Sequence, residues 1–140
     1  MLTQAPIPSW SSLFHAFWQR PLSLDELSSK WCREGEVAGW FSRSAWSLVR
    51  VVLWRQQYSP SKNIIIWVPD YFCKSSLTPL RALNTNLIFY PINQNLEPDH
   101  KACRVLSKVY TPDLFVMVHY FGCPTFFAAP TKDFCAKHHA

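Results

Sequence analysis

The sequence has 140 residues, which is room for one globular domain and not for two. Hydrophobic residues make up 49% of it and charged residues 16%, which excludes a disordered tail, because such a chain can bury a core. The net charge of +5 comes from lysines and arginines that are scattered singly, so no nucleic acid is expected as a partner.

The five cysteines are an odd number, and no two of them are spaced as C-x-x-C. This pattern argues against a disulfide framework and against a structural zinc site. Free thiols in a reducing compartment are the simpler interpretation. No signal peptide is visible, and the longest apolar run, 64–68, is far too short to span a bilayer. We therefore expect a cytoplasmic protein with no bound metal and no membrane partner.

Residues 1–40 are expected to form a helical, aromatic-rich segment that differs from the rest. Ser23-Leu-Asp-Glu26 is a capping-box pattern, which predicts a helix from there to about Cys32. Large aromatic residues surround it: Trp10, Phe14, Phe17, Trp18, Trp31 and Trp40. Such a segment needs a packing partner, either the domain that follows it or a second copy of the chain.

Residues 41–140 are predicted to form an α/β domain. Residues 42–57 read as a helix that is buried on most of its circumference, because only a narrow stripe of it is polar. Continuous apolar runs, typical of strands covered on both faces, then alternate with helix-length segments. The runs are 64–68, 87–90 and 114–118, and the helical segments are 75–83, 98–108 and 130–139. This alternation predicts a three-layer fold, a parallel sheet flanked by helices.

Each of the three later helical segments contains a proline. Pro79 is compatible with a helix only if it lies in the first turn. Pro98 is well placed for the first helical position, and Pro130 is expected to open the last helix. In parallel sheets of this kind, ligands bind beyond the carboxyl ends of the strands. Here those ends are 69–73, 91–93 and 119–122.

Three segments together resemble one protein family. They are Phe41-Ser-Arg-Ser-Ala45, then Val68-Pro-Asp-Tyr-Phe-Cys73 with Leu87-Ile-Phe-Tyr-Pro-Ile92, and then Val118-His-Tyr-Phe-Gly-Cys-Pro124 followed by Ala136-Lys-His-His139. In this order they resemble the DegT/DnrJ/StrS sugar aminotransferases, and the resemblance covers about residues 36–140. The last segment is the most specific, since it is similar to the family's V-H-x-x-G-x-P stretch, helix and x-K-H-G ending.

The resemblance implies the large domain of a fold-type-I enzyme that depends on pyridoxal phosphate. Members of the family transfer an amino group from an amino-acid donor to a keto-sugar nucleotide, although some are dehydratases, and their active sites form across a homodimer. Their chemistry uses an aspartate at the pyridine nitrogen and a lysine that holds the cofactor covalently. Both positions are expected beyond Ala140, so we expect an incomplete large domain that is inactive alone, and whether the chain is an enzyme stays open.

The resemblance places the cofactor phosphate at the start of the first helix of the domain. Ser42, Arg43 and Ser44 stand where the family has Ser-Gly-Thr. Exposed N–H groups and the positive end of the helix dipole favour a phosphate there, and the Ser44 hydroxyl can donate a further bond. Arg43 departs from the pattern, since it replaces a glycine that permits close approach. The alternative is that Ser42 simply caps the helix.

The resemblance also points to residues that follow two of the strands. Cys73 replaces an aromatic residue that stacks on the cofactor, so Tyr71 or Phe72 is the candidate to take its place. His119 matches the family's histidine at the end of the third strand. Packing at the strand end for Tyr71 and Phe72, and a hydrogen bond within the sheet end for His119, are equally compatible with the sequence.

Two further hypotheses belong to other classes of protein. The chain can be a non-catalytic α/β binding or interaction module, which keeps the fold without the chemistry. A flavodoxin-like nucleotide binder is disfavoured, because the chain has only three glycines and no glycine-rich phosphate loop. If the domain is incomplete, its uncovered sheet edge and apolar faces predict marginal stability and self-association.

Overall fold

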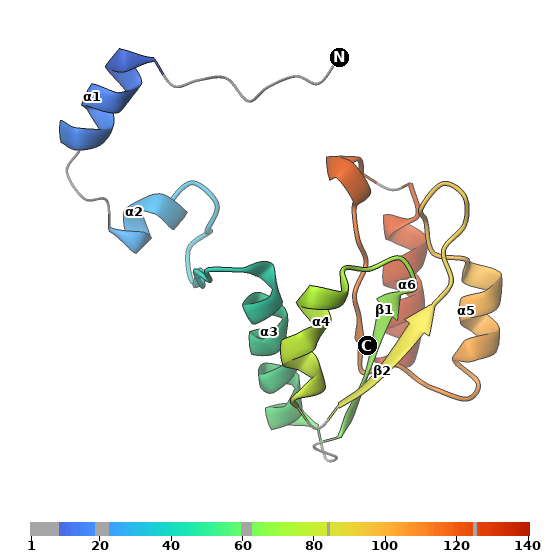
Figure 1. Cartoon of the computed structure of the whole chain (residues 1–140). Coiled ribbons are helices and arrows are strands. Elements are labelled where there is room, and N and C mark those ends of the chain that lie inside the picture. Colours follow the sequence, from blue (N-terminus) through green and yellow to red (C-terminus); the bar gives the residue numbers. More distant parts are fainter. Residues whose placement is uncertain (1–8, 19–22, 60–62, 84, 125) are drawn as a thin grey trace. The chain divides into compact units, whose positions relative to one another are not determined.

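A computed structural model of the protein describes residues 9–18, 23–59, 63–83, 85–124 and 126–140 (Figure 1). The chain divides into two compact units, residues 1–40 and 41–140, and each is described by itself.

The first unit contains two short helices, α1 (Trp10–Trp18) and α2 (Leu24–Ser28). The sequence predicts that residues 1–40 are helical, but it gives bounds only for the second of these helices. The predicted capping box of α2 is confirmed: the Glu26 amide donates to Ser23 Oγ over 3.1 Å, and the Ser23 amide donates to Glu26 Oε2 over 2.9 Å.

The predicted end of α2, near Cys32, is wrong, because the helix stops at Ser28. The Ser28 hydroxyl donates to the Leu24 carbonyl, and the Ser29 hydroxyl donates to the Glu26 carbonyl. Serine hydroxyls that bond to the preceding turn compete with the helical backbone bonds, which favours termination. The chain then turns, and the Cys32 amide donates to the Ser28 carbonyl over 3.0 Å.

The second unit is built on a parallel sheet of β1 (Ile64–Pro69), β2 (Thr85–Tyr90) and β3 (Leu114–Phe115), in the order β2-β1-β3. Ile64 pairs with Thr85 at one end of the β1–β2 ladder, and Trp67 pairs with Phe115 in the β1–β3 ladder. The prediction of three parallel strands is therefore confirmed. The third strand is shorter than predicted, since the regular ladder does not reach 118.

Pro69 accounts for the short third strand. The Val116 amide still donates to the Trp67 carbonyl over 2.8 Å, and in a parallel ladder the next bond would come from the amide of residue 69. Proline has no N–H, so the ladder cannot continue. The Val116 carbonyl instead accepts a bond of 2.9 Å from the Tyr90 hydroxyl.

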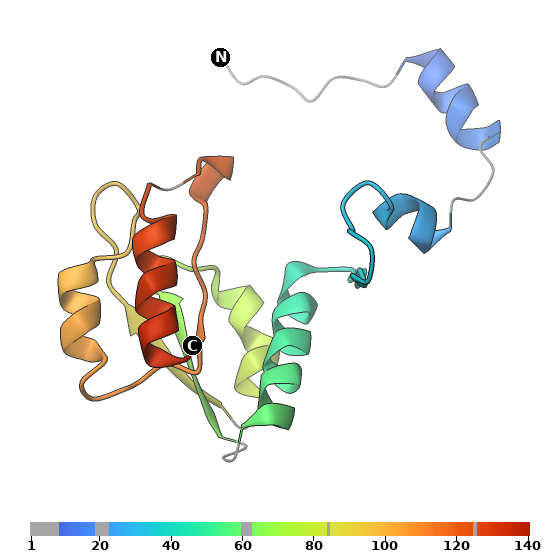
Figure 2. The same cartoon turned by 180° about the vertical axis from the view of Figure 1, so that it is seen from behind.

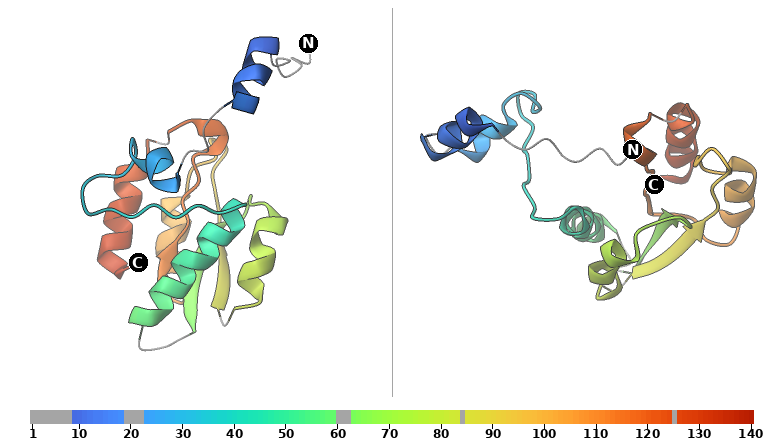
Figure 3. Two further views of the ribbon diagram at one scale, coloured as in Figure 1. Left: turned by 90° about the vertical axis from the view of Figure 1, so that its left-hand side faces the viewer. Right: turned by 45° about the horizontal axis from the view of Figure 1, so that its top comes forward.

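Helices cover both faces of the sheet, which confirms the predicted three layers (Figures 1 and 2). On one face lie α3 (Ser44–Tyr58) and α4 (Lys74–Arg81), and on the other α5 (His100–Leu106) and α6 (Ala128–His138). The right-hand view of Figure 3 shows both pairs beside the sheet. The crossover from β1 to β2 passes through α4, and the crossover from β2 to β3 passes through α5. The two crossovers run in opposite directions across the sheet and lie on opposite faces of it. Both therefore have the same hand, as the general rule for parallel strands requires.

Alternate residues of β1 supply the two halves of the core. Ile64, Ile66 and Val68 are buried against α3 and α4, in a cluster that includes Val52, Leu77 and Leu80. Trp67 points to the opposite face, where it is buried in a cluster with Tyr90, Cys103 and Phe134. A strand that is buried on both faces needs the continuous apolar run that the sequence shows.

The prediction that the first helix of the domain is mostly buried is wrong. Only Ala45 and Val52 of α3 are buried. Trp46, Trp54 and Tyr58 are about half exposed or more, at 49%, 50% and 69%. The helix has a single neighbouring layer, so its outer side lacks cover within the second unit.

The positions predicted for the prolines differ from those observed. Pro79 lies inside α4 and not in its first turn, and it is tolerated because the helix ends soon after, at Arg81, so few bonds are lost. Pro98 precedes its helix and forms a bridge with Ile92, and Asp99 is the N-cap. Pro130 lies in the first turn of α6, which opens at Ala128.

Candidate functional site

The strand order creates a crevice at one end of the sheet. The chain leaves the central strand β1 for β2 on one side and returns to β3 on the other, so the connections after β1 and β3 diverge to opposite faces. Open α/β sheets bind ligands at such a switch point. A cleft of about 430 Å³ lies there, within the roughly 300–1,000 Å³ of small-molecule sites. It is lined by Ser44, Tyr71, Phe72, Cys73, Ser76, Val118 and Tyr120.

The cleft unites predicted site residues that are far apart in the sequence. Ser44 comes from the first turn of α3, whereas Tyr71, Phe72 and Cys73 come from the loop after β1. Of the other predicted residues, Arg43 lines a neighbouring groove of about 820 Å³ between α3 and α4.

Ser42 and His119 are not among the residues that line the cleft or this groove. Ser42 is exposed, and it does not cap α3, because Arg43 is the N-cap. His119 is exposed and immediately precedes Tyr120, which does line the cleft.

Two helices begin at this end of the sheet. Both α3 and α4 run antiparallel to β1, so their N-termini lie together near the carboxyl end of the strand (Figure 1). Neither N-cap residue, Arg43 or Cys73, caps its helix through a side-chain hydrogen bond. Ser44 and Ser76 line both the cleft and the groove between the helices. Helix N-termini and hydroxyl groups attract anions, and none of the lining residues is acidic.

Cys73 carries the reactive group of the cleft. Its sulfur lies 3.0 Å from Ser75 Oγ, and the thiol is exposed. The hydrogen bonds from the Ser75 side chain and backbone, followed by those of Ser76, lower the pKa of the Cys73 thiol. A lower pKa gives a larger fraction of thiolate at neutral pH, which is the nucleophilic form.

An aromatic pair forms the wall opposite the helix N-termini. The ring centroids of Tyr71 and Tyr120 are 5.7 Å apart, and the planes are tilted by 33°. The Tyr120 hydroxyl donates to the Tyr71 carbonyl, which ties the end of β3 to the loop after β1. Burial, with a smaller contribution from the Asp70 charge, raises the pKa of Tyr120. The phenol therefore stays neutral where it lines the cleft.

Ser76 and Tyr120 are cleft residues that the sequence interpretation missed. Ser76 lies in the first turn of a helix that directly follows a buried strand, and this position could have signalled an anion site. Tyr120 adjoins His119 at the carboxyl end of β3, but its direction depends on the turn that follows. There Phe121 and Gly122 have positive φ values of 56° and 74°.

The part of the chain that the structure describes contains no group of three or more His, Cys, Asp or Glu side chains arranged to hold a metal ion. No lysine lines the cleft. Across the described ranges, no helix combines the length and apolarity that a bilayer crossing needs.

Comparisons of the chain with protein-family models, with curated proteins and with solved structures gave no significant match.

Proposed function

We propose that residues 41–140 form a pyridoxal-phosphate-binding α/β domain of the fold-type-I sugar-aminotransferase kind. In this proposal the cleft at the carboxyl ends of β1 and β3 holds the cofactor. The observation that carries it is the union of Ser44 with Tyr71, Phe72 and Cys73 in one cleft, because these residues come from separate segments that each resemble the family.

The residues of the cleft fit the two ends of the cofactor. The N-termini of α3 and α4, with the hydroxyls of Ser44 and Ser76, offer hydrogen-bond donors to a phosphate group. Arg43 adds a positive charge in the adjoining groove. Tyr71 and Tyr120 offer aromatic surface to a pyridine ring, which a thiol at position 73 cannot do.

When bound, pyridoxal phosphate supplies an electron sink for amino-group transfer. The residues of this chain bind and orient it: Ser44 and Ser76 hold the phosphate, and the rings of Tyr71 and Tyr120 fix the plane of the pyridine. No lysine or carboxylate lines the cleft, so binding here is noncovalent. Amino transfer to a sugar nucleotide therefore needs groups other than those that line the cleft.

The experiment is a calorimetric titration of the full chain with pyridoxal phosphate, with pyridoxal and with inorganic phosphate. We expect pyridoxal phosphate to bind at least about tenfold more tightly than either part alone, because the phosphate and the ring use different walls. The double variant Ser44→Ala/Ser76→Ala should lose most of this advantage. Ser59→Ala, at the opposite end of α3, is the matched control and should bind as the unaltered chain does.

Borohydride reduction tests the noncovalent character separately. We expect no stoichiometric trapping of the cofactor at one lysine. Trapping at a single lysine would refute the assignment of this cleft, and equal binding of pyridoxal and pyridoxal phosphate would refute the phosphate site. No measurable binding of pyridoxal phosphate would favour the alternative, a non-catalytic α/β binding or interaction module.

We further propose that the chain forms a homo-oligomer through its first unit. The exposed fractions of Trp10, Phe17 and Trp18 in α1 are 80%, 89% and 84%. Water-exposed aromatic surface of this extent favours association, and a second copy offers the same surface. Sedimentation velocity should show a concentration-dependent dimer that Phe17→Ser/Trp18→Ser converts to monomer. A monomeric unaltered chain would refute this proposal.

A further inference from the structure

The side of α3 that faces away from the sheet carries a row of four large side chains, Trp46, Arg50, Trp54 and Tyr58. They are spaced four residues apart, so they lie next to one another along one side of the helix. All four are exposed, and the ring centroids of Trp54 and Tyr58 are 5.5 Å apart. We call this set the α3 row. It leaves three large aromatic rings in contact with water.

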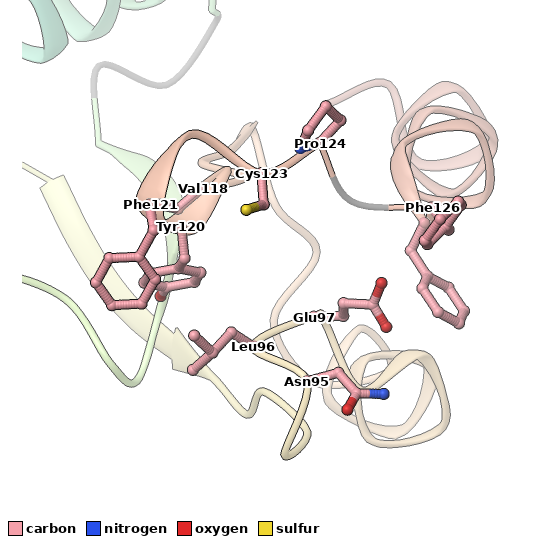
Figure 4. A pocket seen from close by; sticks show the side chains of 10 residues that line it. Asn95, Leu96, Glu97, Val118, Tyr120, Phe121, Cys123, Pro124 and Phe126 are labelled. Atoms are coloured by element: carbon pink, nitrogen blue, oxygen red, sulfur yellow. The ribbon is translucent and has the colours of Figure 1, made fainter.

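The layer that α3 forms with α4 is basic (Figure 3, left). Arg50 and Arg55 belong to α3, and Lys74 and Arg81 belong to α4, whereas neither helix contains an aspartate or a glutamate. The acidic residues of the second unit lie outside these two helices, and one of them, Glu97, lines a pocket beside the loop after β2 (Figure 4). The α3 row is therefore surrounded by positive charge, which an acidic partner complements.

The residue types of the α3 row are those that dominate protein–protein interfaces. Binding hot spots are enriched in tryptophan, tyrosine and arginine, and the row contains no other type. Side chains that are four residues apart on a helix form a ridge. In the commonest class of helix packing, such a ridge fits between the side-chain rows of a second helix. The shape of the α3 row therefore favours a helix as its partner.

Two other partners fit the α3 row less well. A second copy of the row would bring Arg50 against the same basic layer, and like charges repel across an interface. A nucleic acid is held by many contacts between cations and phosphates, and the row offers one arginine among three rings. An arginine that becomes buried at an interface needs an acidic group opposite it. The observations thus favour a partner that brings carboxylates together with apolar side chains.

We propose that the α3 row docks an acidic amphipathic helix of a partner protein. Apolar side chains of that helix pack on the aromatic rings, and one of its carboxylates pairs with Arg50. The other cations of the layer, Arg55, Lys74 and Arg81, attract the acidic helix before it docks. The inference goes beyond the proposed cofactor site and does not depend on it.

The test uses the full chain and labelled synthetic peptides of about 18 residues, long enough to be helical. The first peptide has leucines along one face and glutamates on the others. The second replaces each glutamate by lysine, and the third has the composition of the first but spreads the leucines around the helix. We expect fluorescence anisotropy at constant ionic strength to show that the first binds at least about tenfold more tightly than either control, because it alone offers both carboxylates and an apolar face. Equal affinity for the first peptide and either control would overturn the proposal.

Two variants locate the binding on the α3 row. Trp54→Ser should weaken the first peptide by about tenfold or more, whereas Val105→Ser, at an exposed apolar side chain of α5, is the matched control and should have no effect. Arg50→Glu should remove most of the preference for the glutamate peptide over the lysine peptide. Lys101→Glu makes the same change of charge on α5 and should leave that preference unchanged. Unchanged binding in both Trp54→Ser and Arg50→Glu would overturn the proposal.

Far-UV circular dichroism checks that each variant folds, and if one does not, the three peptides decide the outcome on the unaltered chain. A thymidine oligonucleotide is titrated in parallel. If it binds more tightly than the first peptide and Arg50→Glu weakens it, the α3 row serves a nucleic acid and the proposal is overturned. Sedimentation velocity tests for a second copy, and a dimer that Trp54→Ser converts to monomer would also overturn the proposal.

Discussion

The large aromatic residues of the two units differ in burial. Within the described part of the first unit, Ser28 is the only buried residue, although the segment contains Trp10, Phe14, Phe17 and Trp18. In the second unit Trp67 is completely buried and lies 5.8 Å from both Phe115 and Phe134, measured between ring centroids.

The difference lies in what each unit offers as a packing surface. The first unit has helices of nine and five residues, below the roughly 12–15 residues at which an isolated helix becomes even marginally stable. The second unit has a sheet with helices on both faces, so each apolar side chain of β1 meets a covering layer. Aromatic content therefore does not make a core unless a layer lies opposite to receive it.

The largest effect should separate a buried from an exposed tryptophan. Trp67→Ala leaves a cavity between Tyr90, Phe115 and Phe134 and should cost about 3–5 kcal/mol, much of the stability of a small domain. Trp10→Ala, at a side chain that is 80% exposed, should leave the unfolding midpoint unchanged. Urea unfolding followed by circular dichroism compares them. Equal shifts in midpoint would show that the first unit shares the core.

Alkaline pH should destabilise the second unit through its buried acids. Burial raises the pKa of Tyr90, and burial also raises the pKa of Cys103 to about 12. In the unfolded chain the tyrosine ionises near pH 10 and the cysteine near pH 8.5. The free energy of unfolding therefore keeps its full value below about pH 8.5. It should fall as the pH rises toward 12, by up to about 1.4 kcal/mol per pH unit for each group.

Tyr90→Phe separates this pH effect from the hydrogen bond to the Val116 carbonyl. The variant should lose about 1 kcal/mol at neutral pH, because that bond is gone, yet its stability should fall less steeply above pH 10. Tyr58→Phe, at a side chain that is 69% exposed, is the control. Urea unfolding at a series of pH values gives the loss of stability at neutral pH and the slope of stability above pH 10. Parallel plots of stability against pH for the two variants would contradict the role of Tyr90.

A smaller effect should appear at the exposed thiol of the cleft. Because hydrogen bonds to Ser75 lower the pKa of Cys73, we expect Ser75→Ala to raise that pKa and to slow alkylation of Cys73 by iodoacetamide at neutral pH by a few-fold. Cys123 is also exposed and serves as the control within the same molecule, while buried Cys103 should not react in the folded chain. Peptide mass spectrometry measures each rate, and equal slowing of Cys73 and Cys123 would contradict the prediction.

The smallest effect compares helix caps in the two units. Asp99 Oδ1 accepts bonds from the amides of Lys101 and Ala102, so Asp99→Ala should lower the stability of the second unit by about 1 kcal/mol. Ser23→Ala removes the capping box of α2 and should leave the cooperative transition where it is, because that helix lies outside the packed core. A shift of the transition by Ser23→Ala would mean that the units unfold together.

Features set by neighbouring residues could be predicted from the sequence. The continuous run from Ile64 to Val68 indicated a strand covered on both faces, and Ser23 with Glu26 indicated a capped helix start. The prolines were harder to interpret. Pro98 fits a first helical position as well as it fits the bridge with Ile92 that it forms, and only the neighbouring strand end decides between them.

The sites depended on contacts between residues that are distant in the sequence. The family resemblance indicated Ser44, Tyr71, Phe72 and Cys73, but the parallel order of β1 and β3 brings Tyr120 to the same cleft. No local pattern marked the α3 row as exposed, because tryptophan and tyrosine are as typical of a core as of an interface.

The sequence by itself determined the strands, their parallel arrangement and the two-sided core, because these follow from the spacing of apolar side chains along a few residues. Only the tertiary structure decided which side chains line the cleft and which face of α3 stays uncovered. A strand or a helix is favoured by its own residues, whereas a site and a buried face exist only where separate segments approach each other.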